Sequence, residues 1–327
     1  MRRPKSLLVS LVLLVDRVPW PPEPAKRPRG RPTTSSARLI MKAVVIMIIR
    51  RLYTAYALLT FLNHAAPLPR QLRALLSEQR RCPSRRTWAR RLAALPPSLP
   101  GLSGGLGRHL VTLLQPWARH GRAVACDSPP LATGGGVWHK QHREHGGIPH
   151  SSIDTEAGWS KSGWHGWWYG WNLPLAVTVG SGWIPRAAEL TVAHQGDTKV
   201  APWLGEQGPG EVRSVLGDTH DNDPDLRRRC HQHGCELVAT RRGPYPHRDG
   251  GVEVRNIFHQ RRSQAIEPVN GLCKNVFECR VKMPVKGRLR SQRLALGAVV
   301  VSQLAWLYQP QQGLPVGQGI KPLLRAA

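Results

Sequence analysis

Two short apolar stretches that run into aspartate decide the fold, residues 122–128 (RAVACDS) and 212–218 (VRSVLGD). Apolar runs of this length, bounded by turn residues, predict buried strands. Asp127 and Asp218 come where these two strands end. We therefore expect two buried strands whose carboxyl ends each present a carboxylate.

The segments around them predict a mixed sheet. Residues 167–180 (WWYGWNLPLAVTVG) and 187–193 (AAELTVA) read as strands on either side of a turn at 181–182, and 235–240 (CELVAT) reads as another. Asp223 followed by Pro224 is typical of a helix start, and a later helix is expected to carry Glu267. Strands that alternate with helices indicate an α/β fold with a mixed sheet flanked by helices.

The first third of the chain predicts a small all-α domain. Residues 38–63 and 67–78 each read as a helix with a buried face. Ser84 can cap a third helix, in which Trp88 and Leu92 share one face. This order resembles a helix-turn-helix DNA-binding unit. Its expected DNA contacts are the arginines on the remaining faces of the third helix, which are Arg85, Arg86, Arg90 and Arg91.

Charge is distributed unevenly along the 327 residues. The chain has 47 Lys and Arg against 20 Asp and Glu, a formal charge of +27. Residues 1–120 hold 22 of the basic residues but only 3 of the acidic ones. This excess favours a polyanionic partner, with nucleic acid first and an anionic membrane surface second. It indicates a basic anchoring module followed by a module that uses carboxylates.

Residues 1–37 are predicted to form a basic, Pro-rich arm that is flexible. Residues 19–34 (PWPPEPAKRPRGRPTT) suit an extended chain that lies along phosphates. The apolar run at residues 6–15 (SLLVSLVLLV) is too short to span a bilayer and no cleavage site follows it, so an N-terminal helix is preferred to a targeting signal. No membrane partner is expected.

Three acidic residues in the second module suit two-metal chemistry. Mg²⁺ and Mn²⁺ prefer oxygen ligands, and two or three carboxylates hold them. Two such ions activate the attacking oxygen and stabilise the leaving oxygen in phosphoryl transfer. Asp127, Asp218 and Glu267 fit this demand by position. Lys274 lies seven residues after Glu267, two helical turns along the same face, where its ammonium group can contact DNA.

The motifs around these residues resemble a known family. Residues 125–128 (ACDS), 216–219 (LGDT) and 266–267 (IE) with Lys274 are similar to the three acidic motifs of DDE-type bacterial insertion-sequence transposases. Residues 160–170 (SKSGWHGWWYG) are similar to the strand region that follows the first acidic motif. The resemblance covers roughly residues 38–310.

The resemblance implies an RNase H-like catalytic domain over residues 121–310, behind a helical DNA-binding domain over 38–120 and before a tail over 311–327. It implies Asp127, Asp218 and Glu267 as catalytic residues and as ligands of two Mg²⁺ or Mn²⁺ ions. The implied activity is cleavage and strand transfer at terminal inverted repeats, joined to target DNA by a homodimer in the bacterial cytoplasm, at the nucleoid. The residues expected to contact DNA in this domain are Lys274, Arg262, Lys161 and Trp164.

Several alternatives stay open. The chain can be an inactive or domesticated copy that only binds DNA, or a protein of anionic membrane surfaces. Asp154 is a rival to Asp127 as the first acid. The cluster Cys230, His231, His233 and Cys235 offers zinc ligands but is crowded, and a helix end before a strand is preferred. The tryptophans at 159–171 suit either a packed core or stacking on unpaired bases.

Overall fold

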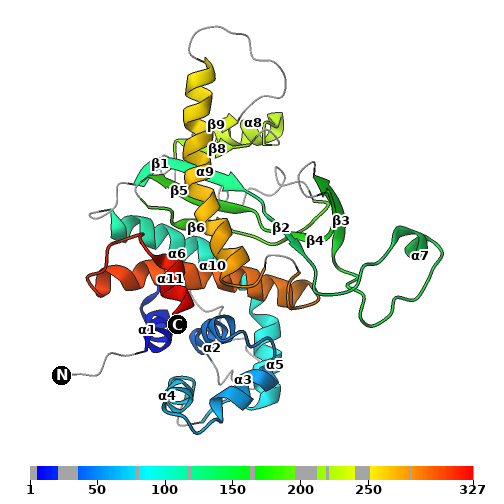
Figure 1. The fold of residues 1–327 in the computed structure, drawn as a ribbon, viewed down its shortest axis with the longest axis vertical. Coiled ribbons are helices and arrows are strands. Elements are labelled where there is room, and N and C mark those ends of the chain that lie inside the picture. The colour runs from blue at the N-terminus through cyan, green and yellow to red at the C-terminus, as the bar shows by residue number, and fades with distance from the viewer. Residues whose placement is uncertain are drawn as a thin grey trace, which may run out of the picture.

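The structure is a computed structural model that describes residues 6–20, 36–78, 81–115, 120–162, 166–180, 182–195, 212–218, 221–239, 251–279 and 282–326. A layer of helices from the first third of the chain lies against a helix near the C-terminus, and the strands lie beyond it (Figure 1). The described part is therefore a mixed α/β fold with flanking helices, as the sequence predicts at that level.

The secondary-structure elements among the described residues up to 115 are helices. They are α1 (Leu7–Leu14), α2 (Ala37–Ile49), α3 (Ala55–Leu62), α4 (Pro67–Leu75), α5 (Arg85–Ala94) and α6 (Leu99–Leu114), with 3₁₀ turns η1 (Val15–Arg17) and η2 (Pro96–Ser98). Three of them begin at a hydroxyl cap, because Ser36, Thr54 and Ser84 each accept a bond from a backbone N–H three residues on.

Both ends of the chain join the helical core. Helix α10 (Arg288–Gln311) is buried along most of its length and contacts α1, α2, α6 and α11 (Ile320–Arg325). Leu8, Val9 and Leu11 of α1 have no exposed surface. An apolar helix without a polar face is stable only when it is covered. Residues 7–17 of the expected arm and 320–325 of the expected tail are therefore ordered helix, and residues 21–35 lie outside the described residues.

The main sheet contains β1 (His120–Asp127), β5 (Leu175–Gly180), β6 (Pro185–Ala188), β8 (Ser214–Gly217) and β9 (Glu236–Ala239). Its order is β6-β5-β1-β8-β9. β5 runs antiparallel to both of its neighbours, whereas β1, β8 and β9 are parallel to one another. The order places the two strands that end in aspartate side by side at the centre of the sheet.

A second sheet forms where one long strand was expected. The predicted strand 167–180 divides at Leu173–Pro174 into β4 (Gly166–Asn172) and β5, which belong to different sheets. Proline has no N–H for the ladder, so the strand ends there. The expected strand 187–193 likewise divides, into β6 and β7 (Thr191–Val192). The second sheet has the order β2-β4-β3, with β2 (Pro130–Ala132), β3 (Gly158–Ser162) and β7 paired to β4.

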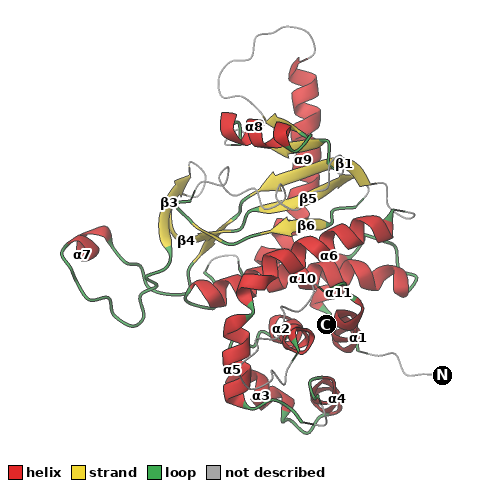
Figure 2. Ribbon diagram, turned by 180° about the vertical axis from the view of Figure 1, so that it is seen from behind, coloured by secondary structure: helices red, strands yellow, loops and turns green. Residues whose placement is uncertain are grey.

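Helices cover both faces of the main sheet (Figure 2). α8 (Pro224–Gln232) starts at Asp223, whose side chain accepts from the Leu226 N–H, and it packs on β9. Val124 and Cys126 of β1 belong to the hydrophobic core between α8 and the sheet. α9 (Gly251–Asn275) contacts β1, β5 and β8, and its core includes Ala125. Alternate residues of β1 therefore face α8 and α9, and Asp127 shares the α9 side with Ala125.

The expected helix end before a strand is observed at the cysteine–histidine cluster. Cys230 lies in α8, Cys235 precedes β9, and both are buried in the core beneath α8. Across the described ranges no three His, Cys, Asp or Glu side chains are grouped to hold a metal ion. All six cysteines are free thiols.

A short helix, α7 (Lys140–Glu144), lies in the connection between β2 and β3. It projects away from the rest of the molecule in both views (Figures 1 and 2). None of the helices within the described ranges is both long and apolar enough to cross a membrane.

Candidate functional site

The two predicted aspartates end neighbouring parallel strands. Ala125 of β1 pairs with Leu216 of β8, so the same register continued by two residues sets Asp127 opposite Asp218. Side chains at matching positions of adjacent strands point to the same face. Asp127 faces α9, and Asp218 directly follows β8 at the same carboxyl edge of the sheet, where ligands of open α/β sheets commonly bind.

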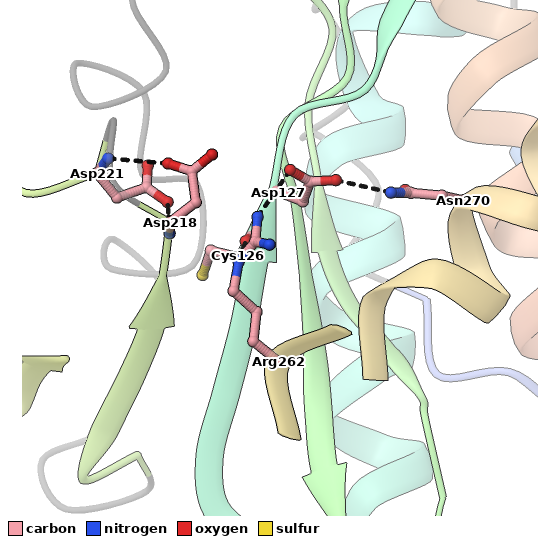
Figure 3. Close-up of polar contacts among 6 residues, drawn as sticks. All are labelled: Cys126, Asp127, Asp218, Asp221, Arg262 and Asn270. Atoms are coloured by element: carbon pink, nitrogen blue, oxygen red, sulfur yellow. Dashed lines mark hydrogen bonds and ion pairs between the residues drawn. The ribbon is translucent and has the colours of Figure 1, made fainter. Parts of the chain in front are cut away.

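Helix α9 holds the carboxylate of Asp127 (Figure 3). Nη2 of Arg262 donates to Oδ1 at 2.8 Å, and Nδ2 of Asn270 donates to Oδ2 at 2.7 Å. Nε of Arg262 also donates to the Cys126 carbonyl at 3.0 Å. The Arg262 side chain is 9% exposed and that of Asp127 25% exposed. A charge-assisted pair at this depth is less screened than one at the surface.

The helix can make both contacts because of the spacing of its residues. Arg262, Ile266 and Asn270 are four apart, so they line one face of α9. Ile266 and Ala265 are fully buried against the sheet. Pro268 lies within the helix and is exposed. The apolar contacts keep the helix against β1 on both sides of this proline.

Hydrogen bonds with Asp221 hold Asp218. The Asp221 carboxylate accepts from the Asp218 N–H at 2.9 Å, and the Asp221 N–H donates to Oδ1 of Asp218 at 3.2 Å. Asp221 packs under Gly217, where an added Cβ would lie 2.5 Å from the Asp221 Cβ. Burial, and next the charge of Asp221, raise the pKa of the Cys126 thiol, so this thiol is protonated and unreactive.

Glu267 does not join the two aspartates. It is exposed on α9, three residues before the buried Asn270, and it belongs to no metal-binding group of described residues. Residues three apart on a helix are neighbours, so Glu267 flanks the Asn270 contact without entering it. Lys274 is half-buried farther along α9. The expected set of three converging carboxylates is therefore absent from this arrangement.

The carboxylates of Asp127 and Asp218 are oxygen donors of the kind that bind a divalent cation, but Glu267 does not join them. Mg²⁺ is commonly held by one or two carboxylates, with waters and substrate phosphates completing its shell. An ionised carboxylate has about four lone-pair sites, of which Arg262 and Asn270 use two at Asp127. Asp127 and Asp218 therefore suit one such ion, whereas Glu267 lies outside that donor set.

The structure separates the residues predicted to contact DNA. Arg85, Arg86 and Arg90 are exposed on α5, opposite the buried Trp88 and Leu92, as the pattern predicts, and Arg91 is half-buried. Lys161 is exposed, with its ammonium 5.4 Å from the ring centroid of Trp167. Arg262 was expected to contact DNA, but it is buried on Asp127. Trp164 lies outside the described residues.

Asp154 is a structural acid. It is 1% exposed and accepts from the hydroxyl of Thr133 and from the Gly287 N–H at 3.0 Å, just before α10. It therefore joins the connection between β2 and β3 to the start of the central helix. It is not a rival to Asp127 at the carboxyl edge of the main sheet.

Sequence reasoning missed Asn270 and the role of Arg262. The available signal was their spacing: two polar residues eight apart frame the apolar residues of one helix face. Polar groups on such a face need partners when buried. The spacing pattern alone does not identify Asp127 as the partner of these two side chains.

No protein-family model matches the chain, and no curated protein matches it. One solved structure to which it is similar is the cryo-EM structure of a piggyBac transposase synaptic complex with hairpin DNA. The identity is 10% and the TM-score 0.39, over 98% of this chain and 76% of that one. Similarity at this level establishes neither a shared fold nor a shared function, so function must follow from the chain's own residues.

Proposed function

We propose that the chain is a DNA transposase that cuts and joins phosphodiester bonds at an edge built on Asp127 and Asp218. The observation that carries this proposal is that Asp127 ends β1 and Asp218 directly follows β8, the parallel strand beside it. Two carboxylates close to solvent at a sheet edge suit a metal-assisted reaction on a phosphate.

The topology supports an RNase H-like catalytic domain. A central strand has an antiparallel hairpin on one side and two parallel strands on the other. A late helix, α9, contacts β1, β5 and β8 and binds the Asp127 carboxylate. We propose on this basis an RNase H-like domain, with the first acid on β1 and the second after β8.

Asp127 and Asp218 would hold a Mg²⁺ or Mn²⁺ ion, with waters and a substrate phosphate completing its shell. When bound, the metal stabilises charge on the phosphate oxygens and lowers the pKa of a bound water. The protein's part is to fix the Asp127 carboxylate through Asn270 and to set the position of Asp218 through its hydrogen bonds with Asp221. Glu267 would need to turn toward Asn270 to contribute a ligand.

The basic face of α5 is proposed to bind the phosphate backbone of inverted-repeat and target DNA. Replacing Arg85, Arg86 and Arg90 together by Gln is expected to make the dependence of DNA affinity on salt less steep. The slope of the log association constant against log salt concentration should shrink in magnitude by about 2–3, since each phosphate contact contributes about 0.9. Fluorescence anisotropy with labelled duplex DNA over a salt series measures the slope. Arg228→Gln, an exposed arginine on α8, is the control. An unchanged slope in the triple variant would exclude this face.

The hairpin of β3 and β4 is proposed to stack on unpaired bases. Trp167 is 66% exposed beside Lys161, which pairs a flat aromatic surface with a cation. Trp167→Ala is expected to weaken binding of single-stranded DNA by about 1–3 kcal/mol, with Trp167→Phe retaining most of the affinity. Quenching of 2-aminopurine in the oligonucleotide reports the stacking. Tyr56→Ala is the control, because Tyr56 is similarly exposed on α3. Equal affinity of the alanine variant and wild type would contradict the assignment.

The activity is tested with DNA that contains the sequences flanking the gene, incubated with Mn²⁺ or with EDTA. The proposal predicts metal-dependent nicks at the ends of the element and joined products when target DNA is added. Joining two ends implies a homodimer on DNA, acting at the nucleoid in the bacterial cytoplasm. Binding without any metal-dependent product would contradict the enzyme.

A DNA-binding protein without cleavage is the second candidate. The observation that favours it is the exposed Glu267 together with an Asp127 whose two oxygens are bound to side chains of α9. A protein that only binds DNA is expected to bind the same flanking sequences in a salt-sensitive way and to give no cleavage product with Mg²⁺ or Mn²⁺.

A further inference from the structure

Arg262 is a buried cation on the carboxylate that the proposed function assigns to a metal. Its guanidinium contacts Oδ1 of Asp127 at 2.8 Å from the side of α9, as Figure 3 shows. Asn270 contacts the other oxygen but carries no charge. The compensating positive charge at Asp127 is therefore supplied by Arg262.

The position of Arg262 is fixed independently of Asp127. Its Nε donates to the Cys126 carbonyl at 3.0 Å, so the head group is held to the end of β1 by a backbone contact. Arginine stays protonated at any working pH, so it cannot release the carboxylate by losing a proton. A cation that binds Asp127 from the Asp218 side therefore meets a permanent positive charge.

We propose that Arg262 is the internal counter-ion of Asp127 in the metal-free protein, and that a divalent cation binds by displacing or weakening that ion pair. Asn270 keeps the carboxylate oriented during the exchange. This inference rests on the proposed function, because it takes Asp127 and Asp218 as the cation's ligands.

The two contacts then have opposite effects on metal affinity. Removing a like charge next to the ion favours its binding, so Arg262→Gln is expected to raise the affinity for Mn²⁺ by about tenfold or more. Removing a neutral partner that orients a ligand disfavours binding, so Asn270→Ala is expected to lower the affinity by about 10–100-fold. A purely structural role for Arg262 would not raise the affinity.

The experiment uses the full chain and Mn²⁺ alone, without DNA. Free Mn²⁺ is measured by its electron paramagnetic resonance signal, and thermal unfolding is followed with Mn²⁺ and with EDTA. The expected result is tighter Mn²⁺ binding in Arg262→Gln than in wild type, with a larger rise in the unfolding midpoint on adding the metal. Arg262→Lys retains the charge and is expected to stay near wild type. Arg262→Met, a second neutral variant, is expected to bind Mn²⁺ more tightly than wild type and replaces Arg262→Gln if that variant is poorly folded.

Arg261→Gln is the matched control, because Arg261 is the exposed neighbour on the same helix. Equal or weaker Mn²⁺ binding in Arg262→Gln than in wild type would overturn the inference, as would an equal rise in affinity in Arg261→Gln. DNA cleavage that depends on Asp218 while Arg262→Gln binds Mn²⁺ like wild type would reject the counter-ion and keep the proposed function. Absence of Mn²⁺ binding in wild type and all variants would also overturn the inference, and the cleavage assay would then decide the function separately.

Discussion

Asp218→Asn is expected to abolish metal-dependent DNA cleavage while DNA binding persists. A carboxamide keeps the size of the side chain and still offers an oxygen to the Asp221 N–H, so this hydrogen bond can persist. It removes one of the two charges proposed to hold the metal. Because a metal supplies several kcal/mol of transition-state stabilisation, we expect the cleavage rate to fall by at least about 10³-fold.

The measurement is single-turnover cleavage of labelled duplex DNA in Mn²⁺, alongside binding of the same duplex in EDTA. Asp225→Asn is the control, because Asp225 is an exposed acid on the first turn of α8 and lies outside the proposed site. The Asp225→Asn variant is expected to cleave the labelled duplex at the wild-type rate. An active wild-type preparation and an equally active Asp218→Asn variant would show that the site is elsewhere.

Asp154→Ala is expected to lower the free energy of unfolding by about 3 kcal/mol, since it leaves the Thr133 hydroxyl and the Gly287 N–H without their acceptor. Both donors are held in the interior where the strands meet α10. The Tyr169 hydroxyl keeps its bond, because it donates to the backbone carbonyl of residue 154. Urea unfolding followed by tryptophan fluorescence measures the loss.

Glu144→Ala is the control for that experiment. Glu144 is an exposed acid that pairs with Lys140 at 3.5 Å on α7. Exposed pairs of this kind contribute less than about 1 kcal/mol. A loss for Asp154→Ala no larger than that for Glu144→Ala would mean that the buried network does not join the sheet to α10.

The sequence predicted the strands that carry Asp127 and Asp218 because apolar runs that end in an acid are local patterns. The capped starts of α5 and α8 were predictable for the same reason: Ser84 and Asp223 bond within their own first turn. The buried face of α5, with Trp88 and Leu92, also followed from spacing alone.

Long-range packing could not be predicted in this way. Leu8 and Val9 lie in an apolar run whose packing partner has no local signature in the sequence. The partner in the structure is α10, nearly 300 residues away along the chain. The contact of Asn270 with Asp127 spans 143 residues of sequence. Glu267 was placed by motif position, but the orientation of α9 is set by Ile266 and its neighbours, which turn Glu267 outward.

The most direct test of the account is anomalous diffraction from crystals of the protein bound to DNA and soaked in Mn²⁺. The account predicts a manganese peak between the carboxylates of Asp127 and Asp218, with Arg262 withdrawn from Oδ1 of Asp127. A peak away from both aspartates, or a fully bound DNA end with the Arg262–Asp127 pair intact and no peak beside it, would contradict it.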